Sequence, residues 1–491
     1  MLNKWKQKIT KFVCFALTCQ LFVLTAWAKT DWPSDTGIMA ESGIVMDMDS
    51  GAILYGQNIH LPYYPASITK ILTALIVLEN CNLDDTVTFS TTAVNQVEAD
   101  SGNKISVVAG DELSVEDCLY ALLLVSCNQV ANALAEHTAG SIPAFVDMMN
   151  EKLAELGCQE SHFENPSGLN NDNQYVSAYD MALIAQAAYD NETMVEISSA
   201  TTHKIAPTTQ NPDGFTIRGE HRLCVTEDPS SPYYYPEAVA GKTGYLIKAG
   251  NTLVTYAVKD NRRLVSVILK GQPRQYFVDG KALLEFGFRS FQNYTVADYE
   301  SRYVTGNETI NLDKGSFQAS DLMIDPDSVI TLPNGATFED ADISLGALPE
   351  ISPENAVALL TYTYNDRVIG TAYLLAKDGV TIDDDDSSSS TDSANASADT
   401  SDKNASLATS SNADKSQHSH GNFSVAGVLI TILIVALALA VIGLVSWFIY
   451  SKKKEAKALA ERRERRRQRL QRSGDEEEFE RLLAEYKNKK K

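Results

Sequence analysis

Histidine is scarce in this chain, with seven residues among 491, and their positions match none of the spacings that metal ligands use. Two of the seven, His418 and His420, lie in a stretch of small polar residues that offers no fold to hold an ion. The sequence therefore predicts no metal site, and we expect no cofactor.

Basic residues are also in the minority, with 42 Lys and Arg against 64 Asp and Glu. They concentrate at the two ends: residues 1–28 carry a charge of +4 and residues 451–491 carry +7, which leaves −33 for residues 29–450. A surface this acidic repels polyanions and favours solubility. We therefore expect no nucleic-acid partner.

A basic segment followed by an apolar one opens the chain. Four lysines up to Lys11 precede an apolar run from Phe12 to Trp27, and Ala26-Trp27-Ala28 places small residues around a cleavage point. Residues 1–28 are therefore predicted to be a cleaved export signal, with an uncleaved membrane anchor as the alternative.

Beyond this signal the chain has an odd number of cysteines, which cannot make a complete set of disulfides. We expect most of them to be small buried hydrophobic side chains. The five are Cys81, Cys118, Cys127, Cys158 and Cys224.

A second apolar segment, residues 425–450, contains 26 uncharged residues and is followed by three lysines. As a helix it would measure about 39 Å, against a hydrocarbon core of about 30 Å, so we predict a transmembrane helix with its basic flank in the cytoplasm. Residues 383–422 are predicted to be a disordered acidic and Ser-rich linker, and residues 451–491 a charged cytoplasmic tail. The folded part would then lie outside the cell, held at the cell membrane by one helix.

Residues 36–290 are predicted to form an α/β domain. A hairpin is expected over residues 43–55, and strand-like runs return at residues 252–258 and 264–269. Between these runs, helical patterns begin at candidate cap residues, and strands at both ends with helices between them indicate one sheet built from distant parts of the chain. The expected helices cover residues 114–125, with Leu119, Leu122, Leu123 and Val130 in one apolar pattern, and residues 141–156, 177–189 and 281–288.

Residues 291–382 change in character to short strands, which predicts a small β-domain. Strands are expected at residues 328–332, 357–364 and 368–375, and Asn365-Asp366 has the composition of a hairpin turn. The segment shows no polar cluster resembling a site, so we assign it a spacing or docking role.

The stretch from Pro65 to Leu75 is the centre of the chemistry. It is predicted to begin a helix, with Ser67 in the first turn, where unpaired backbone N–H groups favour negative charge. Lys70 lies one turn further on the same side, so its amine can reach the Ser67 hydroxyl. A serine beside an amine is the arrangement that an acyl-transfer nucleophile requires.

Two further motifs follow. Ser126-Cys127-Asn128 comes after an apolar helix, and Lys242-Thr243-Gly244-Tyr245 precedes the strand expected at residues 252–258. Ser-x-x-Lys and Ser-x-Asn both recur elsewhere in the chain, whereas Lys-Thr-Gly occurs once. The order and context of the three motifs therefore carry the signal.

With these motifs the chain resembles the penicillin-binding, active-site-serine family, and most of all its low-molecular-mass D-alanyl-D-alanine carboxypeptidases. The resemblance covers residues 36–290 and includes the segments 163–169 and 177–182. It implies an antiparallel sheet flanked by helices, as in β-lactamases and transpeptidases, then a small β-domain and a membrane anchor. Cys127 and Gln129 depart from the family pattern, where Ala or Gly and Asp are usual, and we expect changed rates but the same reaction.

The resemblance also implies roles. Ser67 attacks the carbonyl between two terminal D-alanines of a peptidoglycan stem peptide, and Lys70 accepts its proton, which requires about 4–5 kcal/mol to make the amine neutral at pH 7. Burial and the charge of Lys242 would lower the pKa of Lys70. The other implied roles are proton relay for Ser126, substrate binding for Asn128, Lys242, Thr243 and Arg274, and an oxyanion hole from the N–H groups of Ser67 and Tyr245, beside Gly244.

Three alternatives remain open. A β-lactamase would need a Glu in place of Pro166 before Leu169-Asn170, so β-lactams are expected to act as covalent inhibitors and not as substrates. A membrane-anchored β-lactam sensor would share the same acylating domain. A cysteine peptidase would use Cys127 with His137.

Overall fold

The computed structural model describes residues 29–98, 101, 104–349 and 351–382. The predicted signal, linker, transmembrane helix and tail lie outside the described residues. Within the described part of the chain, no helix combines the length and the apolar character that crossing a membrane requires.

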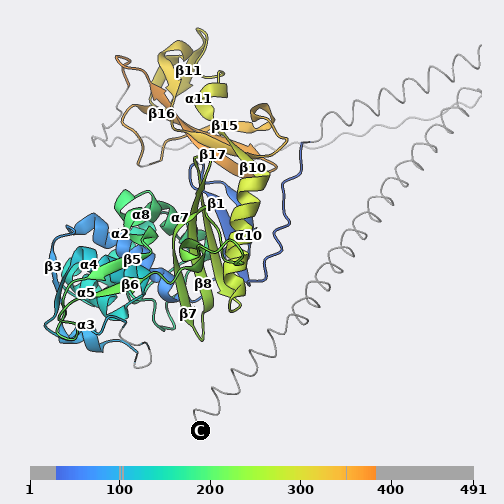
Figure 1. Ribbon diagram of the computed structural model, residues 1–491. Helices are drawn as coiled ribbons and strands as arrows, with labels where there is room; N and C mark the ends of the chain where they lie inside the picture. The colour runs from blue at the N-terminus through green and yellow to red at the C-terminus, as the bar shows by residue number, and fades with distance from the viewer. Residues whose placement is uncertain (1–28, 99–100, 102–103, 350, 383–491) are drawn as a thin grey trace, which may run out of the picture. The chain divides into compact units, whose positions relative to one another are not determined.

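A five-stranded antiparallel sheet is the centre of the fold (Figure 1). The hairpin from the beginning of the chain pairs with strands from much later, as Val45 opposite Ser266 illustrates. The prediction of one antiparallel sheet from distant segments is therefore confirmed. In spatial order the strands are β2 (Ile53–Gln57), β1 (Ser42–Asp47), β9 (Arg262–Gly271), β8 (Gly250–Lys259) and β7 (Ala238–Leu246).

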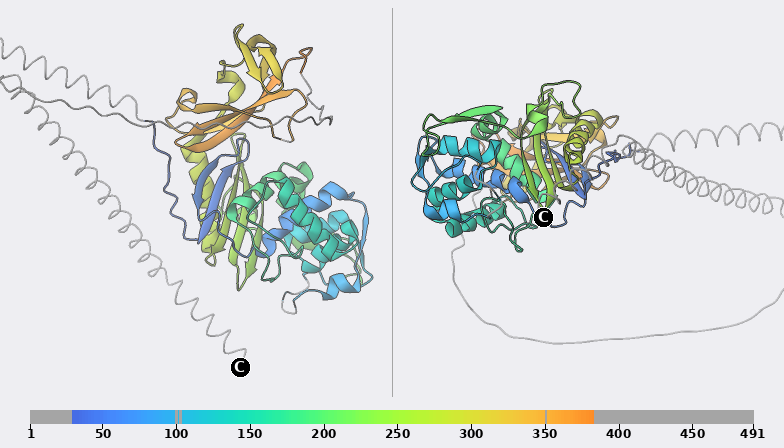
Figure 2. Two further views of the ribbon diagram at one scale, coloured as in Figure 1. Left: turned by 180° about the vertical axis from the view of Figure 1, so that it is seen from behind. Right: turned by 60° about the horizontal axis from the view of Figure 1, so that its bottom comes forward.

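Helices cover both faces of this sheet (Figures 1 and 2). On β1, Ile44 and Met46 point into the core shared with the larger group of helices, whereas Val45 points into the core formed with α10. This alternation is what a strand buried on both faces requires. The larger group contains α2 (Lys70–Asn80), α4 (Val115–Leu124), α5 (Asn128–Ala139), α6 (Ile142–Glu155), α7 (Ala178–Tyr189) and α8 (Glu192–Ser199), and α10 (Gln275–Ser290) covers the other face.

The helix starts predicted at Ser114, Ser141 and Ser177 are confirmed, whereas the helix expected over residues 281–288 is longer and begins at Gln275. The Ser114 and Ser177 side chains cap α4 and α7 by accepting hydrogen bonds from backbone N–H groups three residues on. One expectation was wrong: Val130 does not continue the α4 pattern, because α4 ends at Leu124 and Val130 lies on α5. The chain turns sharply between the two helices at Ser126, where φ is +64°.

Residues beyond 291 form short strands around their own core. Strands β13 (Leu322–Ile324), β17 (Arg367–Ala376), β16 (Ala356–Tyr364) and β15 (Asp342–Gly346) make one sheet, and β10 (Phe291–Thr295) pairs with β14 (Val329–Pro333). Asn365 and Asp366 both have positive φ, as the predicted hairpin turn requires. Contacts group these strands with the first sheet in one unit, so the boundary at residue 291 stays a prediction.

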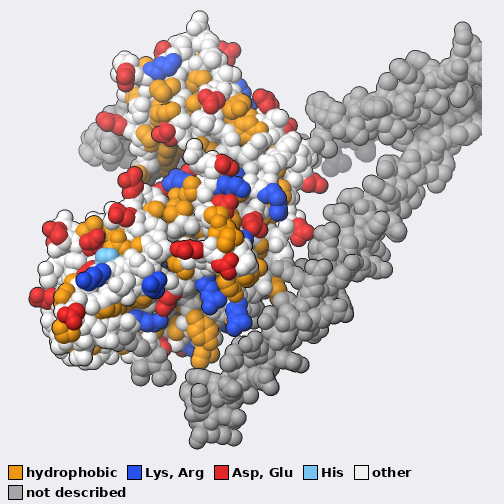
Figure 3. All heavy atoms as spheres, viewed as in Figure 1, with side chains coloured by type: hydrophobic (Ala, Val, Ile, Leu, Met, Phe, Trp, Pro, Cys, Tyr) orange, Lys and Arg blue, Asp and Glu red, His pale blue; other side chains and the backbone are white. Residues whose placement is uncertain are grey.

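The visible surface agrees with the acidic composition. Asp and Glu side chains are spread over the whole described face in Figure 3, and Lys and Arg side chains are interspersed among them. The five cysteines are free, and Cys118, Cys127 and Cys158 are buried, as predicted.

Candidate active site

Ser67 lies in a single 3₁₀ turn, Ala66–Thr69, that leads directly into α2. Lys70 is the first residue of α2, so the nucleophile stands just before the α-helix and not within its first turn. The Lys70 Nζ atom is 3.1 Å from the Ser67 hydroxyl. Ser67 is half-buried, whereas Lys70 has no exposed surface. The two side chains are therefore in hydrogen-bond contact at the edge of the core.

Burial of Lys70 has a direct consequence for its charge. Desolvation, followed by the nearby charge of Lys242, holds the pKa of the Lys70 amine well below its ordinary value, and Cys127 opposes these effects weakly. A lysine in this state spends more time as the neutral amine that a general base must be.

The neighbours of the Lys70 amine determine where its lone pair points. Besides Ser67, it contacts the Asn128 Oδ1 atom at 2.7 Å and the Ser167 backbone carbonyl at 2.5 Å. Both of these oxygens can only accept hydrogen bonds, and a neutral amine has two hydrogens. When Lys70 is neutral, its lone pair is therefore left for the one neighbour that can donate, the Ser67 hydroxyl.

Ser126 lies in the connection between α4 and α5, and Asn128 is the first residue of α5. The Ser126 hydroxyl oxygen is buried and has no hydrogen-bond partner among the described residues. Its backbone is in the left-handed region, which is unfavourable for serine. A buried hydroxyl held without a partner in a strained turn is available to a ligand. A hydrogen bond from the ligand would remove the desolvation penalty of the unpaired hydroxyl.

Lys242, Thr243, Gly244 and Tyr245 lie in β7, which is a strand of its own and not a loop before β8. Strand β7 is at the edge of the sheet, beside the Ser67 turn. A side chain at Gly244 would come within 2.8 Å of the Ser67 backbone nitrogen and 2.4 Å of the Thr252 hydroxyl, so only glycine allows this approach. Thr252 in turn donates to the Pro65 carbonyl at 2.9 Å. The register of β7 and β8 therefore places the Lys-Thr-Gly motif against the nucleophile.

Lys242 is a buried cation. It is 1% exposed, and its Nζ atom donates to the Thr243 carbonyl at 3.0 Å. Desolvation lowers its pKa to about 8, while Glu220 raises the pKa and Lys104 lowers it. Glu220 and Lys104 are themselves an ion pair, 3.0 Å apart. Among the described residues no carboxylate is in hydrogen-bond contact with Lys242, so its positive charge is suited to bind an anionic group.

Two predicted site residues, Tyr245 and Arg274, are exposed to solvent. Tyr245 follows Gly244 along β7 and its side chain is 63% exposed. Arg274 is exposed at the beginning of α10, and no hydrogen bond or ion pair joins it to another described site residue. Its role stays a prediction.

The sequence did not reveal two contributors. The Ser167 carbonyl and the Thr252 hydroxyl both act through contacts with segments distant in sequence. In the sequence, segment 163–169 carries only the family resemblance, because a backbone carbonyl leaves no signature in residue types.

The geometry also removes one alternative. Cys127 is fully buried, and desolvation raises the pKa of its thiol. His137 lies near the opposite end of α5 from Cys127, which directly precedes the first residue of that helix. The two side chains cannot form a catalytic pair.

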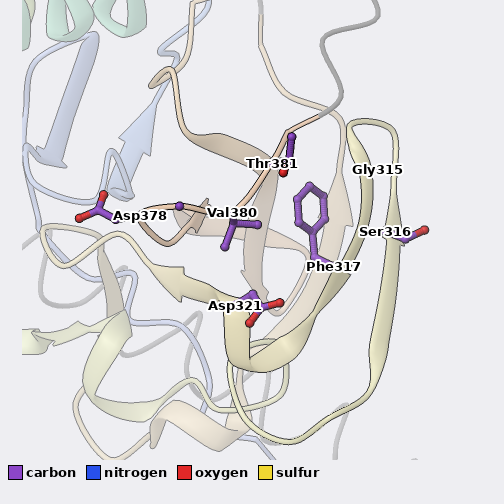
Figure 4. Close-up of a pocket in the computed structure, with 8 residues that line it drawn as sticks. Gly315, Ser316, Phe317, Asp321, Asp378, Val380 and Thr381 are labelled. Carbon is purple, nitrogen blue, oxygen red and sulfur yellow. The ribbon is translucent and has the colours of Figure 1, made fainter.

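A pocket in the β-strand region is separate from this cluster (Figure 4). Asp321 and Asp378 contribute carboxylates, and Phe317 contributes its ring. None of its lining residues is a lysine, histidine or cysteine, so it offers no activated nucleophile. The full lining is Gly315, Ser316, Phe317, Asp321, Asp378, Gly379, Val380 and Thr381.

The fold and the Ser67 cluster together define a serine-dependent acyl-transfer enzyme. Residues 29–272 match the family model described as D-alanyl-D-alanine carboxypeptidase, peptidase family S11, and the chain belongs to this family. It is 30% identical to D-alanyl-D-alanine carboxypeptidase DacA of Haemophilus influenzae over 70% of this chain and 86% of that protein.

The chain is also similar to further proteins of this family. DacF of Bacillus subtilis, also named a D-alanyl-D-alanine carboxypeptidase, is 29% identical over 56% of this chain and 69% of its own length. The crystal structure of penicillin-binding protein 5 from Haemophilus influenzae superposes with a TM-score of 0.54 and 25% identity, covering 71% of this chain and 98% of that one. The predicted family is thereby confirmed, and so is the predicted α/β fold of antiparallel sheets and helices.

Proposed function

We propose that this chain is a serine-type D-alanyl-D-alanine carboxypeptidase that removes the terminal D-alanine from peptidoglycan stem pentapeptides through an acyl-enzyme on Ser67. The observation that carries the proposal is the contact of the Ser67 hydroxyl with a fully buried lysine whose lone pair has no other place to point. Family membership supports the substrate class.

In the first half of the reaction, the Ser67 oxygen bonds to the carbonyl carbon between the two D-alanines, and its proton passes to Lys70. The carbon–nitrogen bond then breaks, and the departing amine takes a proton through the Ser126 hydroxyl, which releases D-alanine. In the second half, water attacks the ester carbonyl. One proton of the water restores the Ser67 hydroxyl, and the shortened peptide leaves as a carboxylate.

The substrate would be held at three points. Its terminal carboxylate binds the buried charge of Lys242 and the Thr243 hydroxyl, with Arg274 as a further cation at the same end of the sheet. The Asn128 side-chain amide donates to the substrate backbone, since its oxygen is occupied by Lys70. The backbone N–H groups of Ser67 and Tyr245 stabilise the developing oxyanion.

β-Lactams would acylate Ser67 in the same way and remain attached. A class A β-lactamase activates its deacylating water with a carboxylate at the position of Pro166, whose carbonyl here accepts a hydrogen bond from Thr73 at 2.7 Å. The neighbouring carboxylate, Glu164, contacts His162 at 3.1 Å. The penicilloyl ester is therefore expected to persist, so the chain acts as a penicillin-binding protein.

The place of action proposed here follows from the sequence. Residues 425–450 would anchor the enzyme by one helix, with the catalytic domain outside the cell membrane and residues 451–491 in the cytoplasm. This arrangement would place the active site beside the cell wall, where trimming of stem peptides affects peptidoglycan assembly and cell shape.

The experiment that tests the function is incubation of the full chain with a stem pentapeptide, followed by mass analysis of the products. Loss of one alanine residue from the peptide supports the proposal, and Ser67→Ala should release none. A sensor would be acylated by penicillin but leave the pentapeptide intact, and a β-lactamase would release hydrolysed penicillin continuously.

A further inference from the structure

The Ser167 carbonyl that contacts Lys70 belongs to a loop organised by one side chain. The Asn165 Oδ1 atom accepts hydrogen bonds from the backbone N–H groups of Gly168 at 2.7 Å and Leu169 at 3.1 Å, and from the Ser167 hydroxyl at 3.0 Å. Its Nδ2 group donates to the Leu169 carbonyl at 3.1 Å. Asn165 therefore bonds to the side chain of Ser167 and to the backbone of the two residues that follow it.

A second polar side chain holds the loop from beneath. Gln174 is 1% exposed, and its Oε1 atom accepts from the backbone N–H groups of Glu164 at 3.1 Å and Asn165 at 3.2 Å. Its Nε2 group donates to the Leu169 carbonyl at 3.0 Å. Gln174 thus ties the beginning of the loop to its end. Its buried amide is tolerated because both of its polar atoms have hydrogen-bond partners in the loop.

The loop is also fixed against the nucleophile turn. Thr73 of α2 donates to the Pro166 carbonyl at 2.7 Å. At Gly168, where φ is +82°, an added Cβ would lie 1.9 Å from the Ala66 carbonyl oxygen. The Ser167 carbonyl therefore lies between two anchor points, one on each neighbouring residue.

We propose that Gln174 and Asn165 are positioning residues for the proton transfer, because they hold the Ser167 carbonyl where it takes one hydrogen of the Lys70 amine and so directs the lone pair to Ser67. This inference rests on the proposed role of Lys70 as the base. Neither side chain touches the substrate or the reacting atoms, and both act through the loop.

The proposal predicts two effects that a purely structural role would not produce together. Without the carbonyl in place, the lone pair is free to point elsewhere, so proton transfer is slower at every pH. A carbonyl oxygen also stabilises an ammonium more than an amine, so its loss makes Lys70 easier to deprotonate. The acidic limb of the acylation profile should therefore move to lower pH. The other titratable groups near Lys70, Lys242 and Cys127, are unchanged by these substitutions.

The test is Gln174→Met, which fills the same buried space without hydrogen bonds, in the full chain. Acylation by a fluorescent penicillin is followed across pH, and the labelled fraction reports correctly folded enzyme. We expect a plateau rate lower by about 10- to 100-fold and a limb midpoint at lower pH. Asn165→Asp, which keeps the accepted hydrogen bonds but adds a negative charge, should instead move the midpoint to higher pH.

The matched control is Asn150→Ala. Asn150 exchanges two hydrogen bonds with the backbone of Phe163, at 2.9 and 3.0 Å, just before the loop but without a bond to Ser167 or its neighbours. Its plateau and midpoint should stay at the wild-type values. A reduced labelled fraction with wild-type rate and midpoint in the Gln174 variant, or the same shift in the control, would overturn the proposal. Absence of D-alanine release by the wild type would instead contradict the proposed function itself.

Discussion

Lys242 lies close enough to Lys70 for its charge to be the second cause, after burial, of the low pKa of Lys70. The two lysines are both buried and come from different elements, one from α2 and one from β7. They need different charge states, because Lys70 must be neutral to accept a proton and Lys242 must be charged to bind a carboxylate. The Lys242 pKa of about 8 keeps it mostly protonated at neutral pH, while that of Lys70 is well below its ordinary value.

Replacing Lys70 by Ala should leave substrate binding intact and slow acylation by about a hundredfold or more, since the serine loses its base. The measurement is the acylation rate constant with fluorescent penicillin at several concentrations, which separates binding from chemistry. An acylation rate equal to that of the wild type would remove Lys70 as the base.

Replacing Lys242 by Met should stabilise the protein while weakening substrate binding. The folded-state pKa is depressed from 10.5 to about 8, so folding carries a penalty of about 3 kcal/mol. Below pH 8 both the folded and unfolded states are protonated and the penalty is complete; it fades as the pH rises from about 8 to 10.5.

Denaturant unfolding of Lys242→Met at pH 7 and pH 10.5 measures this effect, with a larger gain at pH 7. The control is Lys259→Met, because the Lys259 side chain is 48% exposed and its removal should change the free energy of unfolding by less than about 0.5 kcal/mol. Equal gains for Lys242→Met at the two pH values would contradict the assigned pKa.

Glu220 and Lys104, which form an ion pair, should shift the pKa of Lys242 in opposite directions. Glu220 raises the pKa of Lys242 and Lys104 lowers it. The KM for the pentapeptide is expected to rise as Lys242 loses its proton above about pH 8. This rise should begin at lower pH in Glu220→Gln and at higher pH in Lys104→Gln, and a shift in the same direction for both variants would show that the charges do not act on Lys242.

Gly168→Ala should damage the site severely. The new methyl group would overlap the Ala66 carbonyl, which precedes Ser67 directly, and the residue would also be held at positive φ. Gly157→Ala is the matched control, since Gly157 has φ +72° but nothing within 4 Å of an added Cβ. We expect the control to lose about 1–2 kcal/mol of stability with normal acylation. Gly168→Ala should lose more stability and most of its acylation rate, and equal behaviour of the two variants would refute the close approach.

Much of this architecture could be predicted from local sequence signals. The caps at Ser114 and Ser177, and the hairpin at residues 43–55, depend on short-range hydrogen bonds and turn chemistry that residue types encode. Strand β7 was not among the expected strands, because Gly241, Lys242 and Gly244 have low β-propensity and its pairing with β8 determines its conformation.

Part of the candidate site could also be predicted from local sequence signals. Ser67 and Lys70 are three residues apart, so helical spacing alone brings them together. The Ser167 carbonyl and the left-handed turn at Ser126 are set by tertiary contacts and backbone conformation, which residue types do not specify. Motif order was enough to predict the function. The direction of the Lys70 lone pair could not be predicted, because it depends on contacts with segments distant in sequence.

The central claim is that the Ser67 hydroxyl, activated by a neutral Lys70, becomes the acyl-enzyme. The most direct measurement is peptide mass analysis of the full chain after brief reaction with penicillin. A penicilloyl adduct on the peptide containing Ser67, absent in Ser67→Ala, is the predicted result. An adduct on any other residue, or undiminished labelling of Ser67→Ala, would contradict it.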